Sequence, residues 1–295
     1  MGTQTVLESE TLQKSEKRAT GKRMPSFVIR PPKGWQGLQL RELWRYRELL
    51  WFLTVRDVKG RYRQMALGPL WLTIRPVLNM LILTLVFSRV AKLPSNGLPY
   101  PILTFSALLP WMFFSTAVDS SSRSLVGQTG VISKVYFPRL VVPIAAIFSG
   151  VVDFIFAAVV LVGMMIAYGF APGPGALLLP FFVLLAAASA LTIGLWTATL
   201  SVRFRDLQFA VAFLLTAGMY VTPVAYAANA FPHRWLTMLK LNPMFWVVEG
   251  FRWSLLGRGT APQPFMLISV AGVLVLLITG AYVFRRSERN IVDIL

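Results

Sequence analysis

Long uninterrupted apolar runs constrain this 295-residue chain more than any other feature. A helix needs about 20 apolar residues to cross the ~30 Å hydrocarbon core of a bilayer, and several runs meet that length. Only 14% of the residues are charged, whereas about a quarter are charged in a typical soluble domain. The chain is therefore predicted to be an all-α integral membrane protein.

The apolar runs predict six transmembrane helices. A seventh region, residues 227–264, is aromatic but is interrupted by proline and charge, and its apolar pieces are too short to cross. We expect this region to form re-entrant extracytoplasmic helices that dip into the outer leaflet between spans five and six. The predicted spans cover about residues 70–90, 101–119, 139–168, 176–202, 207–226 and 265–284.

The residues before the first span divide into two predicted segments. Residues 1–37 are polar and charged, which is typical of a disordered cytoplasmic N-terminus. Residues 38–69 are predicted to form an amphipathic interface helix and a linker, followed by a transmembrane domain over residues 70–295. Trp44 and Trp51 suit the headgroup layer of the membrane. A short soluble helix packed on a partner is the alternative.

Positive charge indicates how the chain is oriented. The formal net charge is +17, and fourteen of the 29 Lys and Arg residues lie in residues 1–69, with three more after Phe284. The positive-inside rule then predicts cytoplasmic termini on a multi-pass protein of the cytoplasmic (inner) membrane, with anionic membrane lipids as partners and no nucleic acid. Fewer basic residues are predicted on the extracytoplasmic side of the membrane. They are Arg89, Lys92, Arg234, Lys240, Arg252 and Arg258.

Few side chains could perform chemistry. The chain has no cysteine and a single histidine, His233, so disulfides and transition-metal sites are not expected. A phosphate-binding G-x-x-x-x-G-K-[ST] loop is absent from the sequence, which excludes ATP binding by that motif. Asp153 and Glu249 are too few for paired acid–base catalysis. We therefore predict no catalytic residue, no metal site and no cofactor in this chain.

Polar and aromatic residues recur along one face of spans one and five. A charge is costly in lipid, so Arg75 and Asp153 should face protein or a water-filled path. Aromatic rings along such a path could stack on sugars. The alternative is that both faces are seams between packed helices. The face of span one carries Trp71, Arg75, Asn79 and Phe87, and the face of span five carries Phe209, Phe213, Thr216 and Tyr220.

Asp119 has two candidate partners. Arg123 lies four residues later, which favours an ion pair on one helix. Arg75 would lie at a similar depth and could meet the same carboxylate. Spacing along the sequence does not choose between them.

Several motifs occur in an order that resembles the permeases of polysaccharide-exporting ABC transporters, which have the type-2 exporter fold. The resemblance extends from about residue 40 to the C-terminus. Each motif is modest alone, and their order over the chain makes the resemblance specific. The motifs are RDVKGRYR (56–63), LGPLW (67–71), GVISKVYFPR (130–139), RFRDL (203–207), TPV (222–224), LNPM (241–244), EGFR (249–252) and FRRSER (284–289).

This resemblance implies a homodimer that works with two copies of a separate nucleotide-binding subunit, on which ATP and Mg²⁺ would bind. It also implies export of lipid-linked O-antigen, capsular polysaccharide or teichoic acid across the cytoplasmic membrane. Spans one and five of the two subunits would line the channel, and the 120–138 loop would dock on the ATPase. The implied gate residues are Phe231, Trp235, Phe245 and Trp246, and the implied ATPase-coupling residues are Val126, Gly130, Val131, Ile132, Lys134, Val135 and Tyr136.

Two other functions are compatible with the sequence. A type-2 exporter of a small drug or lipid would have a more apolar channel. An intramembrane acyl- or glycosyltransferase would need an acid, base or metal set, for which Asp153, Glu249 and His233 are the candidates.

Overall fold

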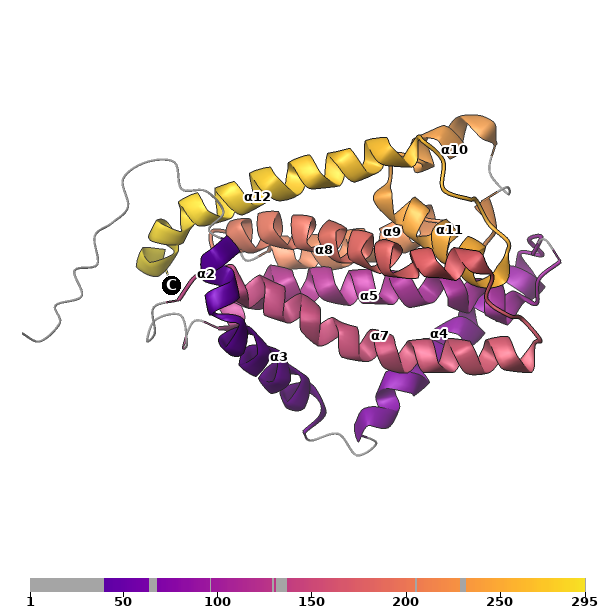
Figure 1. Cartoon of the computed structure of the whole chain (residues 1–295), viewed down its shortest axis with the longest axis horizontal. Helices are drawn as coiled ribbons and strands as arrows, with labels where there is room; N and C mark the ends of the chain where they lie inside the picture. Colours follow the sequence, from indigo (N-terminus) through magenta and orange to yellow (C-terminus); the bar gives the residue numbers. More distant parts are fainter. Residues whose placement is uncertain are drawn as a thin grey trace, which may run out of the picture. The chain divides into compact units, whose positions relative to one another are not determined.

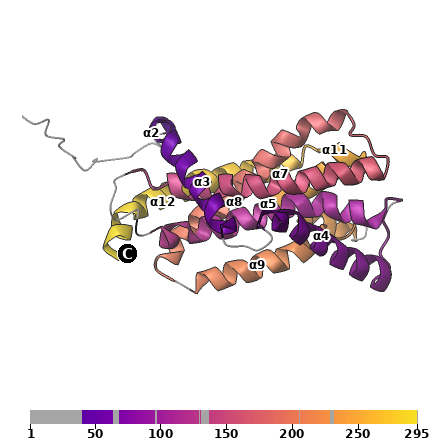
Figure 2. The same ribbon diagram turned by 90° about the horizontal axis from the view of Figure 1, so that it is seen from below.

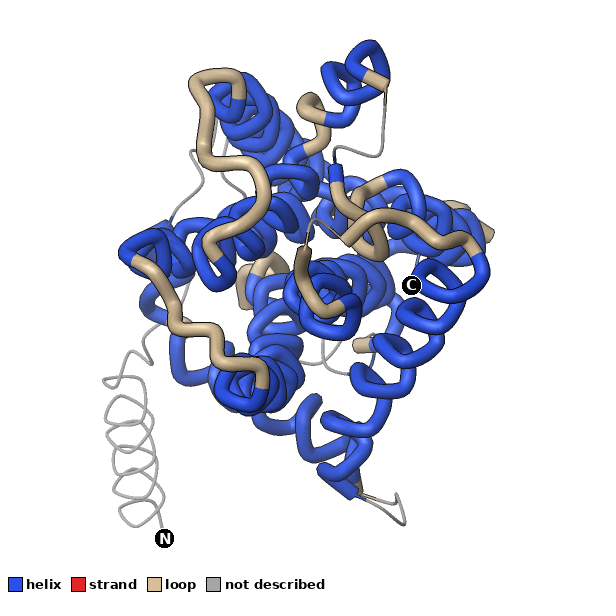
Figure 3. The backbone as a smooth tube through the Cα atoms, turned by 90° about the vertical axis from the view of Figure 1, so that its right-hand side faces the viewer, coloured by secondary structure: helices blue, strands red, loops and turns tan. Residues whose placement is uncertain are grey.

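The computed structural model describes residues 40–63, 68–95, 97–128, 130, 137–204, 206–228 and 232–294. Over this part of the chain all regular structure is helical, as Figure 3 shows, so the all-α prediction is confirmed. Five of these helices are long and apolar enough to cross a membrane, so the chain is a multi-pass membrane protein. They are Trp71–Val90, Tyr100–Gly127, Val141–Ala167, Pro174–Ser201 and Met266–Ser287.

Helix α5 (Tyr100–Gly127) lies at the centre of the bundle, between α7 (Val141–Ala167) and α8 (Leu179–Ser201) (Figure 1). Its most apolar window is 78% buried, whereas the corresponding windows of the other four spans are 22% to 39% buried. Small residues allow this close packing: a Cβ on Gly194 of α8 would overlap with Ser121 of α5. Close approach over small residues is a usual way for membrane helices to associate.

Two helices flank α5 and leave broad apolar faces uncovered. Helix α4 (Trp71–Thr84) continues into a π-helical turn, η2 (Leu85–Val90), and α9 (Leu207–Val221) packs on α5 and α8. Figure 2 shows both helices on the same side of the bundle. Large exposed apolar side chains on α4 and α9 include Trp71, Leu78, Leu81, Ile82, Phe209, Phe213, Leu214 and Tyr220.

The first described helices pack against the bundle. Helix α2 (Leu40–Arg45) is separated at Tyr46 from α3 (Arg47–Tyr62), and α3 packs on α7. The interface helix predicted within residues 38–69 is therefore broken once, at Tyr46, and ends at Tyr62. Trp44 and Trp51 are exposed, and their place at a membrane surface stays a prediction. The predicted disordered segment 1–37 lies outside the described residues.

Two short helices follow α9. Helix α10 (His233–Leu239) and α11 (Pro243–Leu256) are too short to cross a bilayer. The Asn242 side chain accepts a hydrogen bond from the Met244 N–H (3.0 Å) and so begins α11. Gly257 ends it in a left-handed conformation with φ of 62°. Whether these helices enter the membrane stays a prediction.

Three boundaries differ from the predictions. Helix α5 continues through residues 120–127, which were predicted as loop, because Ser121, Ser122 and Ser124 are buried inside the bundle. Helix α12 (Met266–Ile294), which packs on α8, runs ten residues beyond its predicted end. Helix α9 ends at Val221 instead of residue 226, because Thr222 is extended before Pro223.

The remaining turns begin two of the spans. A 3₁₀ turn, η1 (Gly68–Leu70), precedes α4, and another, η3 (Pro174–Leu178), precedes α8. Span four therefore begins close to its predicted start. With 15 residues, α9 is shorter than the five spans, and the sixth crossing is not established by length.

Candidate functional site

A cavity of about 670 Å³ lies between the end of α3 and helices α4, α5 and α7. We call it the Arg75 cavity. Two residues of the predicted channel face, Trp71 and Arg75, line it. Asp153, which was predicted together with Arg75 to face protein or a water-filled path, lines the same cavity. The other residues that matter for its chemistry are Arg61, Tyr62, Leu72, Pro76, Thr116, Asp119 and Ser120.

Asp153 is held by the end of α3, in what we call the Asp153 cluster. Arg61 Nη1 lies 3.2 Å from Asp153 Oδ2, and the Tyr62 hydroxyl donates to Oδ1 at 2.7 Å. Arg61 also donates a hydrogen bond to Ser149. Burial raises the pKa of the Tyr62 phenol, and its hydrogen bond to Asp153 adds to the shift. The phenol therefore stays protonated and donates to the carboxylate.

Of the two candidate partners of Asp119, the structure shows Arg123 of the same helix and not Arg75. Arg123 Nε lies 2.9 Å from Asp119 Oδ1, so the predicted i, i+4 pair is confirmed. Arg75 is exposed to the cavity and forms no ion pair or hydrogen bond with the described residues. Its charge is therefore uncompensated in this part of the chain.

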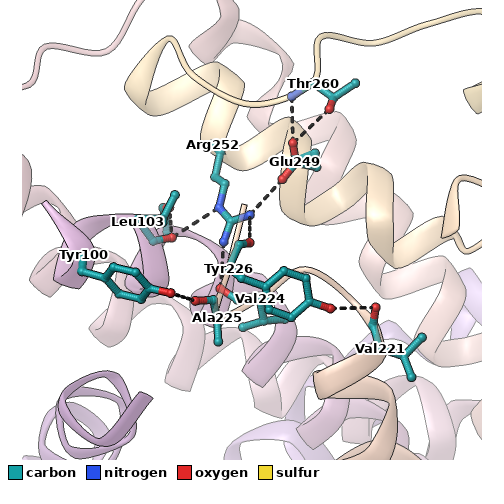
Figure 4. A network of polar contacts seen from close by, with 10 residues as sticks. Tyr100, Leu103, Val221, Val224, Ala225, Tyr226, Glu249, Arg252 and Thr260 are labelled. Atoms are coloured by element: carbon teal, nitrogen blue, oxygen red, sulfur yellow. Dashed lines mark hydrogen bonds and ion pairs between the residues drawn. The ribbon is translucent and has the colours of Figure 1, made fainter. Parts of the chain in front are cut away.

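A second polar cluster joins α11 to the bundle, and we call it the Arg252 cluster (Figure 4). Arg252 Nη1 lies 2.8 Å from Glu249 Oε1, and the guanidinium also donates to the carbonyls of Leu103, Val224 and Tyr226 at 2.8 to 3.3 Å. Glu249 Oε2 accepts from the N–H and the hydroxyl of Thr260 (2.9 and 3.0 Å). Arg252 is 1% exposed, and its predicted position on the extracytoplasmic side of the membrane stays a prediction.

Two tyrosines fix the segment that the Arg252 cluster contacts. The Tyr100 hydroxyl donates to the carbonyl of Ala225 at 2.8 Å, and the Tyr226 hydroxyl donates to the carbonyls of Tyr220 and Val221 at 2.7 and 3.1 Å (Figure 4). Residues 222–228 are all buried. The end of α9 and the start of α5 are thereby joined to α11.

The predicted channel residues lie on two separate helices. On α4, Trp71 and Arg75 are exposed, Asn79 is half-buried, and Phe87 packs near Tyr226 with ring centroids 6.2 Å apart. On α9, all four predicted residues are exposed: Phe209, Phe213, Thr216 and Tyr220. The structure leaves both faces uncovered in one chain, and a channel between two chains stays a prediction.

The predicted gate residues differ in burial. Trp235 of α10 is 61% exposed, whereas Phe245 and Trp246 of α11 are fully buried and pack against each other. The indole N–H of Trp246 donates to the carbonyl of Lys240 at 2.7 Å. Phe231 lies outside the described residues. In this conformation Phe245 and Trp246 hold α11 in place, and gating by them would require α11 to move.

The predicted ATPase-coupling segment is described only in part. Val126 is exposed near the end of α5, and Gly130 is also exposed. Val131, Ile132, Lys134, Val135 and Tyr136 lie outside the described residues. Gln128, beside this segment, donates a hydrogen bond to Asp57 of α3 at 3.3 Å.

A known protein family matches most of the chain. The family of ABC-2 type transporters matches residues 48–256, so this chain belongs to the ABC-2 type transporter family. An ABC transporter works with an ATP-binding partner. The family placement also favours transport over the intramembrane enzyme. Among the described residues, no three His, Cys, Asp or Glu side chains group as metal ligands.

Three relatives show the kind of permease this chain resembles. The O-antigen export system permease protein RfbA of Myxococcus xanthus is 32% identical over 85% of this chain and 96% of its own length. The protein of the same name from Klebsiella pneumoniae is 25% identical over 84% and 95%. The polysialic acid transport protein KpsM of Escherichia coli is 23% identical over 80% and 92%.

Sequence reasoning missed the partners of two charged residues. Arg61 and Tyr62 lie in a motif noted for its family resemblance, but nothing local connects them with Asp153 some ninety residues later. The Glu249–Arg252 pair could have been found, because i, i+3 residues meet on a helix. The interrupted apolar pattern of residues 227–264 concealed it.

Proposed function

We propose that this chain is the channel-forming membrane subunit of an ATP-driven exporter of lipid-linked polysaccharide, most simply O-antigen or capsular polysaccharide. The observation that carries the proposal is the 32% identity with the M. xanthus O-antigen permease, which extends over 96% of that protein. That match covers 85% of this chain, and the family match over residues 48–256 includes both arginine–carboxylate pairs, Arg61–Asp153 and Glu249–Arg252. The relation to a polysialic acid transport protein supports a polysaccharide as the general substrate class.

The proposed assembly is a homodimer with two copies of a cytoplasmic ATPase subunit that holds ATP and Mg²⁺. The uncovered faces of α4 and α9 from both subunits would line the glycan channel, where exposed rings offer many weak stacking contacts and allow sliding. The two termini would be cytoplasmic in the inner membrane. Helix α9 would be the sixth crossing: its 15 residues rise about 22 Å, and buried residues 222–228 would complete the span.

The proposed coupling begins at the end of α5. ATP-driven closure of the partner subunits would push the 120–138 region. The hydrogen bond between Gln128 and Asp57 (3.3 Å) joins that region to α3, and the Asp153 cluster joins α3 to α7. A push at the ATPase surface would in this way reach the Arg75 cavity and the α4 face.

The function is tested by deleting the gene in its host and complementing it with variants. Phe213→Ala combined with Tyr220→Ala should strongly reduce surface glycan while protein level is kept, since both side chains are exposed on α9. Phe156→Ala, at an exposed ring of α7, is the matched control and should leave glycan unchanged. Full surface glycan in the deletion strain would refute the proposal.

A second candidate is an exporter of a small apolar compound. The observation that favours it is the apolar surface of α4, where Leu78, Leu81 and Ile82 are exposed. In that case the Phe213→Ala/Tyr220→Ala variant would leave glycan unchanged and alter resistance to an exported drug.

Topology is tested separately with introduced cysteines, since the chain has none of its own. Single cysteines at Trp44 and Arg286, both exposed, should be labelled only when an impermeant thiol reagent reaches the cytoplasmic side. Labelling of one from each side would refute the even number of crossings.

A further inference from the structure

Two cavities adjoin each other among the spans. The Arg75 cavity (about 670 Å³) is partly polar, whereas a second cavity of about 510 Å³ lies between α5, α7, α8 and α11 and is lined only by apolar residues. We call the second one the α7–α8 groove. Leu109 of α5 and Phe154 of α7 line both cavities. A single amphiphilic molecule could therefore place its polar part in one and its apolar part in the other.

Among the charged residues in and beside the Arg75 cavity, only the positive charge of Arg75 has no described counter-charge. Asp153 is paired with Arg61 at 3.2 Å, and Asp119 is paired with Arg123 at 2.9 Å. Arg75 has no such partner among the described residues. An arginine in a membrane span is costly unless it finds a counter-charge or water. The cavity is thus complementary to a ligand with one negative charge.

The geometry of a guanidinium narrows the ligand further. Its planar array of N–H groups matches the oxygens of a phosphate and can donate two parallel hydrogen bonds. Thr116 and Ser120 also line the cavity and can bond to hydroxyl or ester oxygens. Pro76 has no N–H to offer to the Leu72 carbonyl one turn earlier, and both residues line the same cavity. Phosphate and hydroxyl groups would find partners here.

The α7–α8 groove suits a hydrocarbon chain. Its lining is formed by Leu109, Phe154, Ala158, Leu161, Val162, Met165, Leu179, Pro180, Val183, Leu184, Phe251 and Leu255. Val162 and Leu184 are exposed on the outside of spans α7 and α8, so the groove opens where bilayer lipid surrounds the protein. The nearest and most abundant occupant of such an opening is a lipid of the bilayer itself.

We propose that the Arg75 cavity and the α7–α8 groove together bind one anionic phospholipid of the surrounding membrane, whose phosphodiester gives the whole lipid one net negative charge. The phosphate lies at the Arg75 guanidinium, and a hydrocarbon chain passes Leu109 and Phe154 into the groove. One net negative charge on the lipid matches the one arginine of the cavity that no described carboxylate pairs. The proposal does not depend on which substrate the transporter exports.

The charge requirement is tested by native mass spectrometry of the full chain, delipidated in detergent and titrated with defined lipids. Phosphatidylglycerol, with one net negative charge, should be retained over zwitterionic phosphatidylethanolamine. Arg75→Gln should weaken phosphatidylglycerol retention about tenfold, the size expected for one charge-assisted contact. Arg89→Gln is the control, because Arg89 is exposed on the continuation of α4 and outside the cavity.

The groove is tested with a matched pair of substitutions on α7. Val162→Trp fills the groove from its exposed side and should lower phosphatidylglycerol retention severalfold. Val159→Trp, one turn earlier, exposed and outside the groove, should not. Equal retention of the two phospholipids by the native chain, or unchanged retention in Arg75→Gln, would overturn the proposal. So would retention of a polyprenyl phosphate in place of phosphatidylglycerol, since the cavity would then belong to the exported substrate.

Discussion

The Arg252 cluster and the Asp153 cluster each contain an arginine–carboxylate pair, but the bundle encloses them to different degrees. The side chains of Arg252 and Glu249 are 2% and 3% exposed, whereas those of Arg61 and Asp153 are both 29% exposed. The Arg252 guanidinium also reaches three backbone carbonyls. The Asp153 cluster instead borders a large cavity.

This difference separates a fixed junction from an adjustable one. A buried ion pair costs several kcal/mol of desolvation per ion and persists only where hydrogen bonds satisfy the remaining polar atoms, as they do around Arg252. A half-exposed pair contributes less and can be remade with water or a ligand. We therefore expect α11 to move together with the end of α9, and α3 to be the part that responds to the coupling region.

The largest expected effect comes from Arg252→Met. It leaves the Glu249 carboxylate buried and removes the donor to the carbonyls of Val224 and Tyr226, so we expect a loss of about 3–5 kcal/mol in stability. Thermal unfolding of the protein in detergent measures this. Adding Glu249→Gln should recover part of the loss, and Arg258→Met, at an exposed arginine, should change little. Equal melting temperatures of the Arg252→Met and Arg258→Met variants would contradict the conclusion that the Arg252 cluster is a fixed junction.

Gly250→Ala should have the next largest effect. A Cβ at Gly250 of α11 would overlap with the ring of Phe182 on α8, and overpacking of this kind costs about 1–3 kcal/mol. Gly163→Ala is the control, because no atom lies within 4 Å of its added Cβ. The same unfolding assay applies. Tolerance of Gly250→Ala would mean that α11 is less firmly held than the Arg252 cluster indicates.

Asp153→Asn should destabilise the protein less than Arg252→Met or Gly250→Ala. It removes the charge that Arg61 meets at 3.2 Å, but both side chains are partly exposed, so we expect a loss of about 1 kcal/mol. Tyr62→Phe removes only the 2.7 Å hydrogen bond and should cost about 0.5–1.5 kcal/mol. Asp206→Asn, at an exposed residue without a side-chain cap bond, is the control. A loss as large as that of Arg252→Met would erase the distinction between the clusters.

Arg75→Gln should have the smallest effect on stability. Arg75 is exposed and has no polar partner among the described residues, so in lipid-free detergent we expect a change within about 0.5 kcal/mol. Any larger effect should appear only when phosphatidylglycerol is added. Strong destabilisation without lipid would show that Arg75 has a structural role.

Most of the span positions were predictable because crossing a membrane depends on the composition of each segment. Span three was predicted over 139–168 and is found as Val141–Ala167. The errors occurred where a neighbouring helix or a turn decides the boundary. Helix α5 continues past residue 119 because its serines pack inside the bundle, and α9 ends early because Thr222 precedes Pro223.

Candidate site residues were predictable only where their partners are close in sequence. The Asp119–Arg123 pair followed from i, i+4 spacing and is confirmed. The partners of Asp153 lie on α3, and no periodicity connects two helices so far apart along the chain. The placement of Phe245 and Trp246 also depends on packing between helices, which the resemblance that implied a gate does not specify.

The amino-acid sequence by itself determined that this chain enters a membrane and where its main helices lie, because the transfer of an apolar segment into lipid depends on that segment alone. Only the tertiary structure decided which charged side chains are buried and which are paired. Arg252 becomes buried because carbonyls from two separate segments, the start of α5 and residues 224–226, converge on it, whereas Arg75 is left without a described partner because the nearby carboxylates pair with other arginines.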